Sequence, residues 1–505
     1  MRWQRYWFAG GGRIAAAILR IALAVAVLWG LHRLQTRWPS TAPGGGAHAS
    51  YRGVGVWMLF GDREPAEAVI TALWVIARIS AVTMLLGAWS RISTAISFVT
   101  FMLLAALSYS GVPSWSHLFN PVLLAQFAFL GARGGDVLSV DALVRRLRGR
   151  PAMNVPNGYQ WSIRLVQLAV ALVFASAMFH KLVGAGFTLR WVTTDNLRNQ
   201  ILLRYDLGGW DAHPALVDWL LADVWRFRTA AAFSMLSQSL PILACVFVRR
   251  PLIRVICGSA FVLETLGLGV VMQYWNLEWL PIVAVFIDWD ALVAFVARRP
   301  AVLPEVPADW RPRRKSQIFV IAFILYEGAM AFVPMIDQRL NTYPFTGFPL
   351  FAALRVRAPY DEHLPFALPA GHFEVVSDPP VDASLLDAQF RDVYATKSRD
   401  ALHGRLAGIL AEVQRRSPAA KVSALRIWVV ILESPAYPAY AQLLPHSLGV
   451  LAEVRADGTF LCKLDAPLVP RTYFFADAVE PVLLPVAGWA YAVANDGVPW
   501  IVARR

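Results

Sequence analysis

The residue whose type and position most strongly suggest chemistry is Lys181, at the end of a long apolar run. The chain has 47 basic residues, of which only five are lysine, and Lys181 is the one lysine in the first 314 positions. A lysine removed from water can lose its proton and act as a base, whereas an arginine effectively cannot. The alternative is an interfacial lysine that extends its charge into water. We therefore treat Lys181 as a candidate base.

Further polar and aromatic residues are expected beside this lysine. His180 directly precedes it, and the start of the preceding apolar run supplies Trp115, His117 and Asn120. If successive apolar runs cross in alternate directions, these residues reach the same side as the end of the lysine-bearing run. A lysine, two histidines and an asparagine among aromatic rings would form a basic, partly dry pocket. Interfacial histidine and tryptophan also serve as simple anchors, and this alternative stays open.

Three charged residues lie near the middle of other apolar runs: Arg78, Glu264 and Glu327. Charge inside hydrocarbon is costly and is usually buried, paired or functional. We expect Arg78 to pair with one of the two carboxylates, either as a structural ion pair or as part of a proton path. A proton or ion transporter built on these residues is a weaker hypothesis, because the chain shows no inverted repeat.

The composition predicts a membrane protein. Of the 505 residues, 57% are hydrophobic and 16% charged, whereas soluble domains average about 25% charged residues. The net charge of +13 comes without a nucleic-acid-binding motif, so we assign it to basic loops beside the membrane and expect no nucleic-acid partner. Three cysteines with no paired or metal-type spacing predict neither a disulfide framework nor a metal site.

Nine apolar runs approach the roughly 20 residues that a transmembrane helix needs. They lie near 14–34, 69–88, 92–110, 117–132, 161–182, 229–248, 252–272, 277–297 and 317–336. The fourth is short and begins with Asn120 and Pro121, so we expect it to be tilted or partly re-entrant. The fold class is therefore an α-helical polytopic membrane bundle with about nine transmembrane helices.

The distribution of arginine predicts the topology. Residues 133–150, 249–254 and 298–315 are rich in arginine, and such loops are cytoplasmic by the positive-inside rule. Nine crossings that start from a cytoplasmic N-terminus place all three loops inside and the C-terminal part outside. We expect a membrane domain over 1–340 and an extracytoplasmic α+β domain over 341–505.

The C-terminal part alternates between helical and strand patterns. Residues 383–396 and 399–416 read as amphipathic helices, 422–433 as a buried strand, and 447–464 as a hairpin that turns at 456–458. No nucleophile elbow, metalloprotease motif or phosphate loop accompanies them. This domain therefore predicts no catalytic site of its own.

Over roughly residues 14–350 the chain resembles the vitamin K-dependent γ-carboxylase-like transmembrane domain, also called the HTTM domain. The similar segments are FASAMFHKL at 174–182 with Trp191 and 195–197, 117–120 with 138–141, 277–281 with 286–288, and 343–349. Their order and spacing, rather than any one of them, support the resemblance. It implies a multi-pass protein of a bacterial inner membrane.

The resemblance also implies a chemistry. In the animal carboxylase a lysine of this motif is taken as the base that deprotonates vitamin K hydroquinone. Oxygenation of the quinol then gives a strong base that removes a γ-proton from a peptide glutamate, and carbon dioxide adds. Lys181 matches that lysine, with His117 and His180 as hydrogen-bond or proton-relay partners. The residues expected to line a quinone pocket are Trp115, Asn120, Trp191, Asp195 and Asn196. Reduced quinone is then the expected cofactor and a glutamate-like group outside the cytoplasm the expected substrate, which would make the protein a lyase.

The chain departs from the animal enzyme in two places near the site. A few more residues separate Lys181 from Trp191, and Glu264 stands about where the animal enzyme has a histidine. The rival hypothesis is therefore a non-catalytic scaffold that binds lipid or quinone or assists assembly of a partner. A base predicts that Lys181→Arg abolishes function, whereas a scaffold predicts that it is tolerated.

Overall fold

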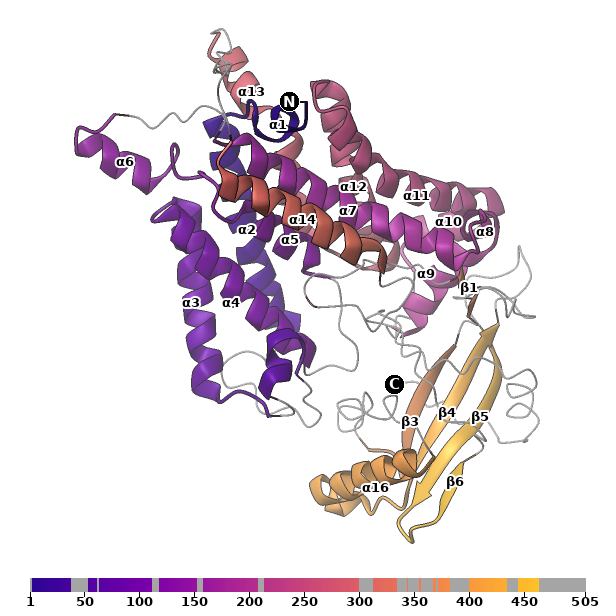
Figure 1. Cartoon of the computed structure of the whole chain (residues 1–505). Helices are drawn as coiled ribbons and strands as arrows, with labels where there is room; N and C mark the ends of the chain where they lie inside the picture. Colours follow the sequence, from indigo (N-terminus) through magenta and orange to yellow (C-terminus); the bar gives the residue numbers. More distant parts are fainter. Residues whose placement is uncertain are drawn as a thin grey trace.

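The computed structural model describes residues 2–37, 53–60, 63–110, 118–151, 158–207, 213–298, 312–333, 343, 354–355, 367–368, 371–381, 399–433 and 444–462. Most of these residues are helical, and a small sheet with one helix lies toward the C-terminus (Figure 1).

Seven helices are long and apolar enough to cross a membrane, which supports a multi-pass membrane protein. They are α2 (Arg13–Arg37), α3 (Glu67–Leu86), α4 (Ser90–Ser110), α7 (Gln160–Gly184), α11 (Val224–Val246), α12 (Pro251–Met272) and α14 (Arg314–Phe332). The chain also forms shorter helices around them. These are α1 (Arg2–Phe8), η2 (Gly55–Phe60), α6 (Val140–Leu147), α8 (Arg190–Thr193), α9 (Asn196–Leu207) and α10 (Ala215–Leu221).

Two of the nine expected spans are not continuous helices of full length. The fourth is α5 (Asn120–Phe129), whose ten residues cover about 15 Å, half of a bilayer's hydrocarbon. The eighth is a 3₁₀ helix, η3 (Leu277–Phe286), followed after a bend of 73° by α13 (Trp289–Val296). The described residues therefore contain seven full-length candidates, or eight if the bent pair counts as one span. The expectation of about nine transmembrane helices, the fourth of them tilted or partly re-entrant, is therefore confirmed in part by the described residues.

The η3 segment nevertheless runs the length of α2 in the opposite direction. At one end Arg33 donates to Glu278, 2.7 Å away. At the other end the amides of Ile14 and Ala15 donate to the carboxylate of Asp290, at 3.3 and 3.0 Å. The intervening part of α2 is about 27 Å long at 1.5 Å per residue. A 3₁₀ helix rises about 2 Å per residue, so the ten residues of η3 cover about 20 Å, and the residues from η3 to Asp290 on α13 cover the remainder.

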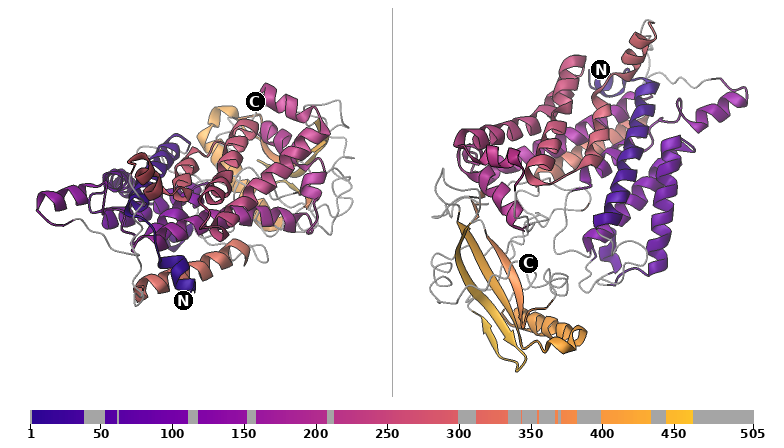
Figure 2. Two further views of the ribbon diagram at one scale, coloured as in Figure 1. Left: turned by 90° about the horizontal axis from the view of Figure 1, so that it is seen from above. Right: turned by 180° about the vertical axis from the view of Figure 1, so that it is seen from behind.

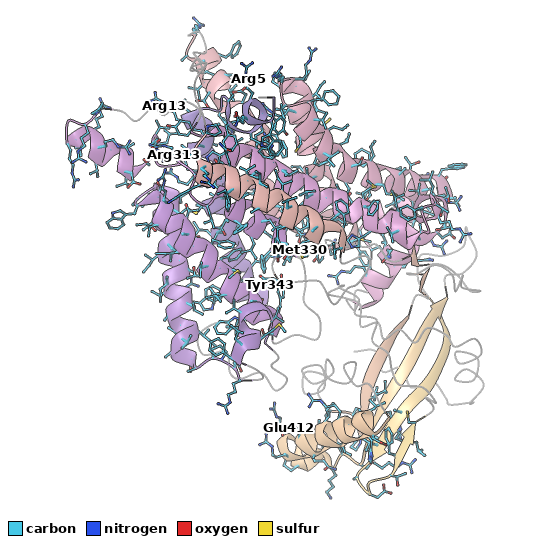
Figure 3. All side chains as sticks on the ribbon, viewed as in Figure 1. Arg5, Arg13, Arg313, Met330, Tyr343 and Glu412 are labelled. Carbon is cyan, nitrogen blue, oxygen red and sulfur yellow. The ribbon has the colours of Figure 1, made fainter. Side chains whose placement is uncertain are left out.

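The α5 segment also joins the two ends of the bundle. Just before α5, the carbonyl of Leu118 accepts from the indole of Trp279, beside the Arg33 end of α2. After α5, the carbonyl of Leu138 accepts from Arg20, near the beginning of α2. The turns and bends between α5 and Leu138 thus continue from the end of this short helix to the beginning of α2. Figure 3 shows Arg5, Arg13 and Arg313 at the end that this path reaches.

A four-stranded antiparallel sheet with the order β3-β4-β5-β6 forms the C-terminal unit. Its strands are β3 (Gly371–Asp378), β4 (Ala424–Glu433), β5 (Leu444–Arg455) and β6 (Phe460–Cys462), and a parallel pair, β1 (Leu354–Arg355) with β2 (Ala367–Leu368), precedes them. Helix α16 (Arg399–Arg416), followed by the short η6 (Pro418–Ala420), packs Leu406 and Val413 against Leu425 and Val454 in the core of this unit. The predicted helix, strand and hairpin turn are confirmed, whereas the predicted helix at 383–396 falls outside the described residues.

Candidate functional site

Lys181 lies inside the bundle, on the last turns of α7. Its side chain is 1% exposed, and its Nζ donates to Oε1 of Gln238 at 3.0 Å. The same nitrogen lies 5.0 Å from the ring centroid of Trp191, on α8, as in a cation–π contact. A lysine that only extended its charge into water would be exposed, so that alternative does not describe Lys181.

A buried carboxylate on α12 completes the network around this lysine. Glu264 accepts from the hydroxyls of Ser234 and Ser237 at 2.9 and 3.1 Å and from Nε2 of Gln238 at 2.7 Å. The Ser237 hydroxyl also lies 2.9 Å from the carbonyl oxygen of Ser234, and its single proton can be donated to only one of these two acceptors. The amide of Gln238 therefore bridges a positive and a negative group, accepting from Lys181 and donating to Glu264.

The three partners on α11 share one helical face. Ser234, Ser237 and Gln238 are spaced i, i+3 and i+4, which brings their side chains together. The sequence analysis does not single them out, because serine and glutamine are uncharged and form no recognisable motif within the apolar run at 229–248. The available signal was that these polar residues share one helical face while the neighbouring apolar runs carry Lys181 and Glu264.

His180 faces a different side of α7, since consecutive helical residues are about 100° apart. Its Nδ1 lies 2.7 Å from the carbonyl oxygen of Ser176. A carbonyl can only accept, so Nδ1 carries the proton and Nε2 is the acceptor atom of the neutral ring. His180 therefore shares the buried end of α7 with Lys181, and no hydrogen bond among the described residues joins the two side chains.

Asp195 and Asn196 support the segment that carries Trp191. Asp195 pairs with Arg198 at 3.0 Å and with Arg228 of α11 at 3.5 Å, which ties the start of α9 to α11. Asn196 is fully buried at the same point. These two residues hold the backbone beside the site, and no described hydrogen bond joins the Asp195 carboxylate to Lys181.

The segments that carried the family resemblance meet around Trp279. Its indole donates to the carbonyl of Leu118 at 2.7 Å, and its ring lies 5.7 Å from that of Phe174 on α7. Phe174 precedes Lys181 by about two helical turns, or roughly 10 Å. Asn120, two residues after Leu118, is buried, whereas Trp115 and His117 fall outside the described residues.

Arg78, Glu264 and Glu327 do not form one cluster. Arg78 is exposed on α3, where it donates to Gln35 of α2 at 2.6 Å and lies over the ring of Trp74. In the described part of the chain Arg78 thus bonds an amide rather than one of the two expected carboxylates. Glu327 is buried on α14, and its Oε2 has no hydrogen-bond partner among the described residues.

A second buried ion pair was not predicted from the sequence. Arg33 donates to both oxygens of Glu278, at 2.7 and 2.9 Å, and to Asn276 at 3.1 Å. Glu278 is fully buried. The arginine ends the first apolar run and the glutamate begins the eighth, so their pairing depends on the antiparallel contact of α2 and η3.

Comparison of the chain with protein-family models, with curated proteins and with solved structures finds no match. Among the described residues, no group of three histidine, cysteine, aspartate or glutamate side chains has the arrangement of a metal site.

Proposed function

We propose that the protein is a membrane enzyme in which Lys181 acts as a base toward a lipid-soluble reduced quinone. The observation that carries the proposal is the buried Lys181 amine, held between Gln238 and the ring of Trp191. The quinone class, vitamin K or menaquinol, follows from the resemblance of the segment around Lys181. We extend the proposal to carboxylation of a glutamate-like substrate outside the cytoplasm.

The neighbours of Lys181 favour the product of proton abstraction. Gln238 accepts from the ammonium, and the face of Trp191 attracts a cation. Glu264 places a negative charge behind Gln238, where little water screens it. A general base works best when its affinity for the proton matches the operating pH, so that it can both bind and release the proton.

The residues present fit a quinol. An indole face suits a planar ring, and an amine suits an acidic hydroxyl. Bound reduced quinone would supply two electrons and a hydroxyl proton, and molecular oxygen would be consumed to give the quinone epoxide and water. Lys181 takes the proton, while Ser234, Ser237 and Gln238 fix the position of the Glu264 charge.

The test uses the full-length protein in lipid nanodiscs with reduced menaquinone or vitamin K, oxygen and bicarbonate. Mass spectrometry measures the quinone epoxide. We expect the wild type to form it and Lys181→Arg to lower the rate by about 100-fold or more, because arginine keeps the charge and loses the basicity. Lys315→Arg is the matched control. Lys315 is exposed in the first turn of α14 and has no contact with Lys181 among the described residues, so this substitution should leave the rate unchanged.

Two results would overturn the proposal. Folded wild type that makes no epoxide, even with glutamate-containing peptides added, has no quinol chemistry. An unchanged rate in Lys181→Arg would show that another group is the base. Quinone binding without epoxide formation would instead support the non-catalytic scaffold.

A further inference from the structure

Helix α6 carries its apolar face away from the protein. Val140, Leu143, Val144 and Leu147 are spaced i, i+3, i+4 and i+7, which places them on one face. All four are exposed, with Leu143 at 55% and Leu147 at 78%. Figures 1 and 2 show α6 extending sideways from the rest of the bundle. A helix exposed to water on all sides would not keep such a face uncovered.

The polar side of the same helix is the side attached to the bundle. The carboxylate of Asp141 accepts from the amides of Trp89 and Ser90, at 2.8 and 2.9 Å, and so caps the N-terminus of α4. The N-cap of α6 is Ser139, which accepts from the amide of Ala142 at 2.9 Å. These contacts fix the orientation of α6, with its polar side toward the α3–α4 turn and its apolar side outward.

Helix α13 repeats this arrangement at the same end of the bundle (Figure 1). Both helices contain the sequence Asp-Ala-Leu-Val, at 141–144 and 290–293. Asp290 accepts from the amides of Ile14 and Ala15 and so caps the N-terminus of α2, as Asp141 does for α4. Phe295 and Val296 of α13 are 81% and 73% exposed. Each of the two helices is thus attached through an aspartate that caps a long helix, and each directs an apolar face outward.

Charge identifies what covers these faces. Arg146, Arg148 and Arg150 are exposed at the end of α6, and Arg298 is exposed after α13. Both anchors lie at the ends of helices long enough to span a membrane, so the apolar faces are continuous with a surface that contacts lipid. Apolar residues flanked by arginine are characteristic of helices that lie in the headgroup region of an anionic leaflet.

We propose that α6 and α13 are paired interfacial helices that bind the anionic phospholipid leaflet at the arginine-rich end of the bundle. Each aspartate holds its helix across the end of a spanning helix, and each Leu-Val face enters the boundary between headgroups and acyl chains. The two helices give the bundle two points of contact with the leaflet. Neither point depends on chemistry at Lys181.

Spin labels test the depth of these faces. The labels are placed by Leu147→Cys, Phe295→Cys and Arg146→Cys, separately, in a chain whose Cys245, Cys257 and Cys462 are replaced by alanine. The protein is reconstituted in nanodiscs of phosphatidylcholine and phosphatidylglycerol at 4:1. We expect the labels at 147 and 295 to be reached by oxygen but not by a water-soluble nickel complex, at a depth of about 5–10 Å. The label at 146, toward the side of the helix, should be reached by nickel.

A second variant tests whether the arginines of α6 are needed to bind anionic lipid. We expect Arg146→Gln, Arg148→Gln and Arg150→Gln together to reduce the phosphatidylglycerol retained in native mass spectrometry, while Arg415→Gln on exposed α16 does not. Labels at 147 and 295 that nickel reaches in the bilayer would overturn the proposal. Labels shielded from both reagents would also overturn it, because they would show that a second copy or another protein covers these faces.

Discussion

At the scale of single residues, the unusual feature is a buried positive charge joined to a buried negative charge through one neutral amide. A buried charge without a partner is strongly unfavourable. Lys181 and Glu264 avoid this because Gln238 satisfies both, with two serine hydroxyls on the carboxylate. The pair is therefore a structural unit as well as a candidate site.

Removing one charge of this unit should be worse than removing both. We expect Glu264→Gln to lower the free energy of unfolding by about 3–5 kcal/mol, because it leaves the Lys181 charge uncompensated. Adding Lys181→Met should restore part of that loss, with a coupling energy of about 1–3 kcal/mol. Unfolding by titration of a denaturing detergent against lipid bicelles measures all three variants. Additive effects of the two substitutions would show that the charges are not coupled.

A titratable residue of the C-terminal sheet predicts a pH dependence. Burial alone would raise the pKa of Glu453, but hydrogen bonds from Arg426, at 2.8 Å, and from Arg455 outweigh it and lower the pKa below its usual value. A carboxyl whose pKa is lower in the folded state stabilises the fold fully above its unfolded pKa of about 4.3. That contribution is lost as the pH falls from there through the folded pKa.

Hydrogen exchange of β4 and β5 in the full chain, corrected for the intrinsic rate at each pH, measures this effect. We expect protection to fall between about pH 5 and pH 3 in the wild type and to depend less on pH in Glu453→Gln. Glu412→Gln is the comparison, because Glu412 is an arginine-paired glutamate on the exposed side of α16. An equal pH dependence in the wild type and Glu453→Gln would contradict the assignment.

At the scale of elements, the turn between α3 and α4 depends on a glycine that no other residue can replace without strain. Gly87 ends α3 with a φ of 70°, and a Cβ at this position would lie 1.7 Å from Nη1 of Arg20. Arg20 in turn donates to the carbonyl of Leu138, ahead of α6. The glycine therefore supports the α3–α4 turn and the attachment of α6 together.

Gly131 provides a matched control, because its φ is 75° and no atom lies within 4 Å of the position that a Cβ would take. Both Gly87→Ala and Gly131→Ala carry the strain of a positive φ, about 1 kcal/mol. We expect Gly87→Ala to be less stable by a further 1–3 kcal/mol or so, because Arg20 must also move. Thermal unfolding in nanodiscs compares the two. Equal losses of stability in the two variants would show that Arg20 can move away from a Cβ at position 87 without a loss of stability.

The sequence predicted where most helices lie but not how each one crosses the bundle. Hydropathy depends on which residues are apolar and not on the helical rise per residue. It therefore could not distinguish the 3₁₀ geometry of η3 from an α-helix. Lys181 was found because lysine is rare in this chain. Gln238 was not found, since it lies 57 residues away along the sequence and only the packing of α7 against α11 joins them. The strands β4 to β6 were predictable because their alternation and turn residues are local signals.

At the scale of the whole molecule, whether the α5 segment crosses the membrane decides on which side α6 lies. If only the seven long helices crossed the membrane, α6 would follow three crossings and lie opposite the N-terminus. If the α5 segment also crosses, α6 follows four crossings and lies on the same side as the N-terminus. The C-terminal sheet lies opposite the N-terminus if both or neither of the α5 and η3 segments cross, and on the same side as the N-terminus if only one of them crosses. A probe near α6 therefore tests the crossing by α5, and a probe on the sheet tests the overall parity.

We propose that α5 and η3 both cross, because each joins the two ends of α2. Cys462 on β6 is a native probe of the sheet, and Arg150→Cys in a Cys462→Ser chain is the probe near α6. In intact bacterial cells we expect a membrane-impermeant maleimide to label Cys462 at once and the cysteine at 150 only after the membrane is permeabilised. Labelling of the position-150 cysteine in intact cells would mean that α5 turns back within the membrane. The arginines of α6 would then lie on the outer face, against the positive-inside rule, and the interfacial role of α6 would have to be assigned to the opposite leaflet.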